Sequence, residues 1–124
     1  MPTLEITKDN FEATVKEGIV LVDWWAAWCG PCRAFAPVFE AASDKHPDVV
    51  FGKIDTEAQR ELAGGFQIRS IPTLMVFREG ILIFAQAGSL PGAALDEIVG
   101  KVKALDMDDV RRQIAEAEQA EAAK

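Results

Sequence analysis

The stretch Trp28-Cys29-Gly30-Pro31-Cys32 follows an apolar run from Ile19 to Ala27 and precedes a segment with helical spacing. The chain has no other cysteines. Two thiols separated by two residues can close a small disulfide ring and can exchange between dithiol and disulfide. The sequence therefore predicts a redox-active pair at a junction between a strand and a helix.

The two cysteines are expected to have different roles. At such a junction Cys29 lies beside the first unpaired N–H groups of the helix, where the dipole favours a thiolate over a thiol. We therefore predict that Cys29 is the attacking sulfur. Cys32 lies one turn into the helix and is more covered, which suits it to resolve a mixed disulfide by attacking Cys29.

Two other interpretations of the pair are weaker. A closed zinc site needs four ligands, and besides carboxylates the sequence offers only His46. A purely structural disulfide across so short a loop removes little chain entropy and stabilises the fold only weakly. Redox activity is favoured over both, and we expect no bound metal.

A longer stretch around the pair resembles the thioredoxin family. It is Asp23-Trp24-Trp25-Ala26-Ala27-Trp28-Cys29-Gly30-Pro31-Cys32, and Ser70-Ile71-Pro72-Thr73 follows further on. The resemblance covers about residues 3 to 105, with separated motifs in the right order. The run from Glu57 to Thr73 is most similar to the bacterial thioredoxin 2 type. Members of that type with an N-terminal zinc-binding extension differ, because this sequence starts directly at the first predicted strand.

The fold class is predicted to be α/β. The unbroken hydrophobicity of residues 19–26 indicates a central strand buried on both faces. Arg78-Glu79-Gly80 is typical of a hairpin turn, which makes the last two strands antiparallel. The resemblance implies the thioredoxin fold, a central mixed β-sheet in the order βαβαββα flanked by helices.

The remaining elements follow from periodicity and capping residues. Predicted strands cover 3–6, 19–26, 49–54, 73–77 and 81–86. Predicted helices run from a Thr7 cap to about Lys16, from Cys32 to about Lys45, from Glu57 to Ala63 before Gly64-Gly65, and onward from a Ser89 cap. Pro37 should kink the second of these helices.

The chain divides into a thioredoxin domain, 1–105, and an acidic Ala/Glu-rich helical tail, 106–124. Six acidic and three basic residues give the tail a charge of -3. Asp106 and Asp109 resemble a capping box at its start. Its narrow apolar stripe consists of Met107, Val110, Ile114 and Ala117. A marginal helix that lies on the domain or frays is favoured over a device for binding partners.

Composition excludes several classes of protein. A chain of 124 residues with 49% hydrophobic residues forms one domain with a genuine core. The net charge of -7 argues against nucleic acid as a partner. No apolar run is long enough to cross a bilayer, and the start lacks the features of a signal peptide. Two cysteines spaced for redox chemistry fit a reducing compartment, so we expect a cytoplasmic protein without membrane association.

Asp23 and Lys53 are candidates for a supporting role. An ionised carboxylate inside an apolar strand is costly, and its pKa should be raised. The resemblance to thioredoxin places Asp23 behind the cysteine pair, where it accepts the Cys32 proton, through water. Lys53 aligns with the family lysine that lies close to this carboxylate. An exposed strand end for Asp23 and an ordinary exposed lysine at position 53 are the competing interpretations.

The bond between Ile71 and Pro72 is cis in thioredoxins, which would turn the Ile71 backbone toward Cys29 for pairing with an extended substrate. A proline before a strand can also mean only a turn. With the residues beside the cysteines, this segment would form a flat apolar rim for substrate. The rim consists of Trp28, Gly30, Pro31, Ile71, Pro72 and Gly88.

Three further residues are predicted to have structural rather than catalytic roles. Trp24 and Trp25 alternate across the buried strand and are predicted to pack in the core, in contrast to Trp28. His46 precedes Pro47 at a helix end and is predicted to interact only with terminal carbonyls, without a catalytic role.

The resemblance implies a protein-disulfide reductase that maintains cytoplasmic redox homeostasis. It binds no cofactor and is a monomer by family default. Its partners would be disulfide-containing target proteins and a thioredoxin reductase, an NADPH-dependent flavoprotein that supplies electrons. Gly30-Pro31 matches reducing members of the family. The alternatives are a disulfide oxidase or isomerase, and a non-catalytic chaperone or binding subunit.

Overall fold

The apolar run after Gly18 forms β2 (Ile19–Trp25), the middle strand of the sheet. In the computed structural model, residues 3–123 are described, and they contain a five-stranded sheet in the order β1-β3-β2-β4-β5. The other strands are β1 (Thr3–Glu5), β3 (Val50–Asp55), β4 (Thr73–Arg78) and β5 (Ile81–Ala87). The predicted central strand is confirmed.

The sheet is mixed, as predicted. β1, β3 and β2 are parallel, whereas β4 is antiparallel to both β2 and β5. The turn between β4 and β5 places Glu79 at φ 54° and Gly80 at φ 82°. Positive φ at both central residues gives a two-residue turn whose twist matches that of a hairpin.

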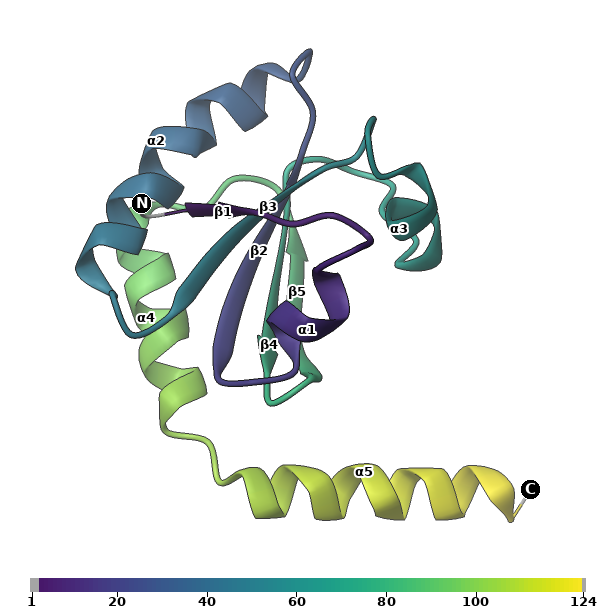
Figure 1. The fold of residues 1–124 in the computed structure, drawn as a ribbon. Coiled ribbons are helices and arrows are strands. Elements are labelled where there is room, and N and C mark those ends of the chain that lie inside the picture. The colour runs from purple at the N-terminus through teal and green to yellow at the C-terminus, as the bar shows by residue number, and fades with distance from the viewer. Residues whose placement is uncertain (1–2, 124) are drawn as a thin grey trace.

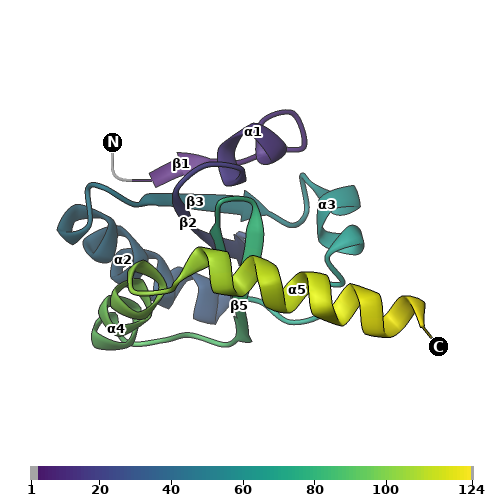
Figure 2. The ribbon, with the colours of Figure 1, turned by 90° about the horizontal axis from the view of Figure 1, so that it is seen from below.

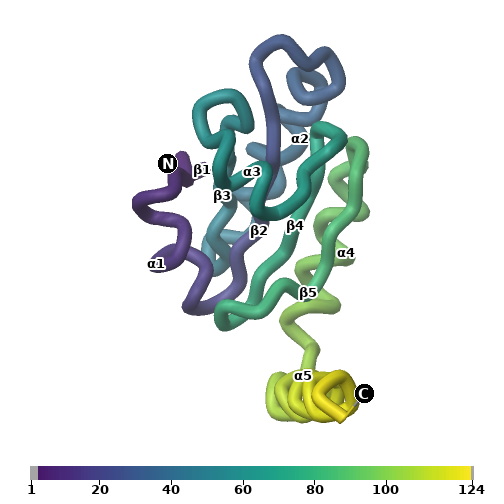
Figure 3. Tube along the Cα trace, turned by 90° about the vertical axis from the view of Figure 1, so that its right-hand side faces the viewer, coloured from purple at the N-terminus to yellow at the C-terminus, as the bar shows by residue number. Residues whose placement is uncertain are grey.

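Helices cover both faces of the sheet (Figures 1 and 3). α1 (Phe11–Val15) and α3 (Arg60–Gly65) pack on one face. α2 (Gly30–Lys45) and α4 (Gly92–Lys103) pack together on the other. The order βαβαββα runs from β2 to α4, and β1 and α1 precede it.

Alternation along β2 divides the core in two. Val20, Val22 and Trp24 are buried on the side of α1 and α3. Leu21 is buried on the side of α2 and α4. Because successive side chains of a strand point to opposite faces, Asp23 shares the face of Leu21, toward α2. Trp24 therefore has the predicted core position, whereas Trp25 is only partly buried.

Three helices start later than predicted, and before α1 and α3 side-chain hydrogen bonds form turns instead. The α1 helix starts after Asn10, since the Thr7 hydroxyl accepts the Asp9 N–H within a turn. Asp55 Oδ1 likewise accepts the N–H groups of residues 57 and 58, which delays α3. α4 starts after Pro91, and the Ser89 hydroxyl instead lies 3.5 Å from the Pro31 carbonyl oxygen.

The predicted helical tail is α5 (Met107–Ala122). Asp106 caps it by accepting the Asp109 N–H at 3.2 Å, and Met107 is buried. Arg111 forms an ion pair of 2.6 Å with Glu79 of the hairpin turn. Beyond these contacts α5 extends past the domain, and residues 111–123 are all exposed (Figures 1 and 2). The expectation that the tail lies on the domain therefore holds only for its first turn.

Among the helices of residues 3–123, none has the length and apolar character needed to cross a membrane.

Candidate active site

Cys29 and Cys32 form a disulfide at the junction of β2 and α2, with their Cα atoms 5.2 Å apart. Cys29 is the N-cap of α2, and the Cys32 N–H donates to Cys29 Sγ at 3.2 Å. Pro31 suits the first turn because its missing N–H needs no partner there. The predicted pair and its place at a helix start are confirmed.

Both cysteines are buried in the disulfide state, with exposed fractions of 4% for Cys29 and 3% for Cys32. The predicted difference in coverage is therefore very small in this state. They cluster with Ala26, and Trp25 and Ile71 pack against the cluster. Trp28, directly before Cys29 in the chain, is 68% exposed and presents an aromatic surface to solvent.

The Ile71–Pro72 peptide bond is cis, as the family resemblance implied. The Ile71 carbonyl oxygen lies 3.7 Å from Cys29 Sγ. Pro72 itself is buried, so it can shape the backbone but offers no surface to a substrate. Gly88 has φ 98° and donates its N–H to the Pro72 carbonyl at 2.8 Å, which joins these two parts of the predicted rim.

Asp23 is fully buried, and neither of its carboxylate oxygens has a hydrogen-bonding partner among residues 3–123. Burial raises the pKa of Asp23 from 3.8 to about 7, and the positive charge of Lys53 opposes this rise. The carboxyl group can therefore gain and lose a proton near neutral pH. The competing interpretation, an exposed strand end, is wrong.

Lys53 lies beside Asp23 in the parallel register of β2 and β3. Its ammonium group does not pair with the carboxylate in the described structure, but lies 4.9 Å from the centroid of the Trp25 ring. A cation over an aromatic face is attracted by the ring. Lys53 thus acts on Asp23 through its field and contacts Trp25 directly.

His46 differs from its prediction. It ends α2, but its ring does not serve the terminal carbonyls. His46 Nε2 lies 2.8 Å from Asp96 Oδ1 of α4, and the ring stacks on Phe51 at a centroid distance of 6.3 Å. His46 and Asp96 are 50 positions apart in the sequence, so no local sequence pattern reveals their contact.

Sequence reasoning missed a groove beside the cysteine pair. It has a volume of about 400 Å³ and is lined by Trp28, Ile71 and Ile68 together with Glu57, Arg60 and Arg69. The arginines reach it from α3 and from the segment before Ile71, so only the fold brings them to Trp28. The arginine directly before Ser70-Ile71-Pro72 was the one available signal.

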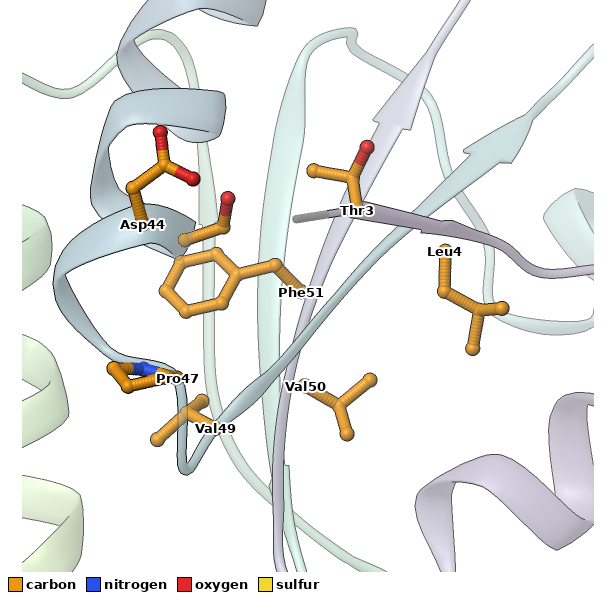
Figure 4. A pocket seen from close by; sticks show the side chains of 8 residues that line it. Thr3, Leu4, Asp44, Pro47, Val49, Val50 and Phe51 are labelled. Carbon is orange, nitrogen blue, oxygen red and sulfur yellow. The ribbon is translucent and has the colours of Figure 1, made fainter. Parts of the chain in front are cut away.

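A second cavity and the distribution of metal-ligand side chains bear on whether a cofactor or a metal ion could bind. A cavity of about 500 Å³ lies between the end of α2 and strands β1 and β3, lined by residues such as Thr3, Asp44 and Phe51 (Figure 4). It does not include either cysteine. Within residues 3–123, no three His, Cys, Asp or Glu side chains gather in a way that could hold a metal ion.

A mixed sheet that presents a dithiol–disulfide pair at a helix N-terminus, opposite a cis-proline, defines a thiol–disulfide oxidoreductase. Comparison with known proteins gives the family. A thioredoxin family profile matches residues 2–103. The chain belongs to the thioredoxin family, and it is a protein-disulfide reductase of that type.

Individual relatives agree with this assignment. The chain is 56% identical to a Streptomyces coelicolor protein named "Putative thioredoxin 2", over 92% of this chain and 86% of that protein. It is 40% identical to thioredoxin of Bacillus subtilis, over 82% of this chain and 98% of that protein. Among solved structures, a mutant thioredoxin from Halobacterium salinarum superposes with a TM-score of 0.77 at 28% identity, covering 84% and 93% of the two chains.

Proposed function

We propose that this chain reduces exposed disulfides of target proteins in the cytoplasm, with Cys29 as nucleophile and Cys32 as resolving thiol. The observation that carries this assignment is the N–H of Cys32 donating to Cys29 Sγ at the start of α2. Such a donor, with the helix dipole, stabilises negative charge on Cys29 more than on Cys32.

The reaction starts from the dithiol. The Cys29 thiolate attacks one sulfur of a target disulfide, the target S–S bond breaks, and a mixed disulfide forms between Cys29 and the target. The second target sulfur leaves as a thiolate and takes up a proton. A target strand could lie along the Ile71 backbone, whose carbonyl is 3.7 Å from Cys29 Sγ.

Resolution requires the Cys32 thiol to lose its proton. We assign the acceptor role to Asp23, which shares the α2 face of the sheet and has a pKa of about 7. The Cys32 thiolate then attacks Cys29 Sγ, the target leaves with both sulfurs reduced, and Cys29–Cys32 becomes the disulfide. Lys53 would limit the rise in the Asp23 pKa, which keeps the carboxylate available near neutral pH.

Substrate contact is assigned to the rim around Cys29. Trp28, Gly30, Pro31 and Gly88 are exposed and Ile71 is half-buried, so they offer an accessible surface beside the buried sulfurs. Pro72 contributes through the cis bond rather than through contact. The domain itself spans 1–105 in this proposal, with 106–124 as an appended helix.

Family membership also indicates the electron donor. Two electrons and two protons must return to the Cys29–Cys32 disulfide after each cycle, and we assign their delivery to an NADPH-dependent flavoprotein, a thioredoxin reductase. The chain then needs no cofactor of its own and can act as a monomer.

Trapping of the mixed disulfide tests the proposal. A reduced Cys32→Ser variant is mixed with a disulfide-containing protein, and intermolecular disulfides are located by mass spectrometry. We expect a stable adduct at Cys29, because no resolving thiol remains. The matched Cys29→Ser variant should give far less adduct at Cys32.

Two outcomes would reject the assignment. Adducts mainly at Cys32 in the Cys29→Ser variant would reverse the roles of the two cysteines. Full cellular function of a Cys29→Ser, Cys32→Ser double variant would instead indicate a binding role without turnover.

A further inference from the structure

The groove beside the cysteine pair differs in charge from the rest of the molecule. The chain carries a net charge of -7, yet the groove is lined by two arginines, Arg60 and Arg69, and one carboxylate, Glu57. A third arginine, Arg33, does not line the groove but lies near Gly30, where a Cβ on Gly30 would be 3.9 Å from its Nη2. The surface around Cys29 is therefore locally basic.

These arginines are not neutralised by strong ion pairs. Arg69 is exposed and has no hydrogen-bonding or ion-pair partner among residues 3–123. Arg60 contacts Glu57 at 3.4 Å, with the two side chains 80% and 53% exposed. Arg33 donates to the Ala27 carbonyl at 2.9 Å, which fixes its position but leaves its charge unpaired.

The groove adjoins the cysteine pair through two of its lining residues. Ile71 lines it and also places its carbonyl oxygen 3.7 Å from Cys29 Sγ. Trp28 lines it and precedes Cys29 in the chain. A segment of a target that entered the groove beside Cys29 would thus meet Arg69 and Arg60.

We propose that this groove receives an extended acidic segment of the target, so that disulfides flanked by Asp or Glu are reduced faster than those flanked by Lys or Arg. The inference rests on the proposed function and names its preferred substrate class. Arg69 would be the main specificity-determining residue, because its guanidinium is free to form a bidentate pair with a carboxylate.

The effect should be moderate and dependent on salt. Exposed charge pairs contribute about 0.2 to 1 kcal/mol each, so pairs with the two groove arginines change rates by roughly 2- to 30-fold. Charges on the rim of an interface act mainly on the association rate. The Debye length falls from about 30 Å at 0.01 M salt to about 3 Å at 1 M, so the preference should largely vanish at high salt.

The test uses three synthetic peptides of equal length with one disulfide each, flanked by Glu, Gln or Lys. The reduced full-length protein is mixed with each peptide, and the rate constant of reduction is followed by tryptophan fluorescence. We expect the order Glu, Gln, Lys from fastest to slowest at low salt, and nearly equal rates at high salt.

Variants then locate the effect. Arg69→Glu should slow the Glu peptide roughly 3- to 10-fold and speed the Lys peptide, whereas Arg69→Lys should keep the wild-type order. The matched control is Arg112→Glu on α5, which changes the net charge equally at the end of the molecule opposite the turn into α2 (Figure 1). It should leave the order of the three peptides unchanged.

Each result is decisive. Equal rates for all three peptides at low salt, or an equal effect of Arg69→Glu and Arg112→Glu, would overturn the specificity proposal while leaving reductase activity intact. No reduction of any peptide would instead contradict the proposed function.

Discussion

Asp23 is the residue whose environment departs most from its ordinary chemistry. It lies in the middle strand with no exposed surface and no hydrogen-bonding partner among the described residues. Such a group destabilises the fold when ionised, because burial removes its hydration. Asp23 therefore lowers the stability of the folded protein when it is ionised, but it provides a group that can accept a proton near pH 7.

Because ionised Asp23 destabilises the fold, we predict that Asp23→Asn raises stability in a pH-dependent way. The folded-state pKa of about 7 exceeds the unfolded value of 3.8, so the folded state binds more protons between these values. Wild-type stability should therefore fall as pH rises through this window. At pH 8 the oxidised variant should be more stable by on the order of 4 kcal/mol, and at pH 4 nearly unchanged. Urea unfolding at both pH values measures this.

The control is Asp9→Asn, the same change at an exposed carboxylate, which should shift stability by less than about 0.5 kcal/mol at either pH. An Asp23→Asn variant less stable than wild type at pH 8 would show that the carboxylate is held by stabilising contacts instead.

The role of a residue could be predicted where neighbouring residues in the sequence indicate it. The cysteine pair, the capping position of Cys29 and the polar Asp23 within an apolar strand could all be identified locally. The contact of His46 with Asp96 and the approach of Arg60 and Arg69 to Trp28 could not, because tertiary packing brings these groups together.

At the scale of elements, the pairing of β1 with β3 depends on one glycine. Gly52 lies opposite Leu4 in this pairing, and a Cβ added to it would overlap the buried Ile6 side chain, with Cγ1 only 2.8 Å away. Ile6 is fully buried, so it has little room to move. The close packing of Ile6, directly after β1, against β3 therefore requires glycine here.

We accordingly expect Gly52→Ala to lower the free energy of unfolding by about 1 to 3 kcal/mol through overpacking. Gly100→Ala provides the opposite case, since Gly100 lies within α4 with open space around its Cβ position. It should raise stability by about 1 kcal/mol through helix propensity. Equal effects of the two variants in chemical denaturation would show that packing at Gly52 is not tight.

Element existence was more predictable than element boundaries. Hydrophobic runs and the turn at Glu79-Gly80 identified the strands correctly. The starts of α1, α3 and α4 were wrong because a polar side chain before a helix can cap it, can bond within a preceding turn as Thr7 and Asp55 do, or can bond a distant residue as Ser89 does. Sequence spacing does not distinguish these uses.

At the scale of the whole molecule, the fold consists of a packed domain and one projecting helix. α5 is attached by the buried Met107 and by the Arg111–Glu79 ion pair, while residues 111–123 are exposed. Its apolar stripe is too narrow to specify from sequence where the helix would lie. Short exposed helices are marginally stable in water.

Hydrogen exchange should therefore separate the two parts. Amides of residues 112–122 should exchange within about 10-fold of unfolded rates, whereas those of β2 and β4 should exchange only through global unfolding. Protection of α5 comparable to that of β2 would contradict this, and loss of that protection on dilution would identify a second copy as the cause.

The central claim is that the whole arrangement around Cys29 makes the chain a reductant. The equilibrium potential of the Cys29–Cys32 pair in glutathione or dithiothreitol buffers tests it most directly, with tryptophan fluorescence as the signal because Trp28 adjoins the disulfide. We predict a value near about -270 mV, as for thioredoxin. A value above about -200 mV would contradict the account, since the pair would then oxidise its targets.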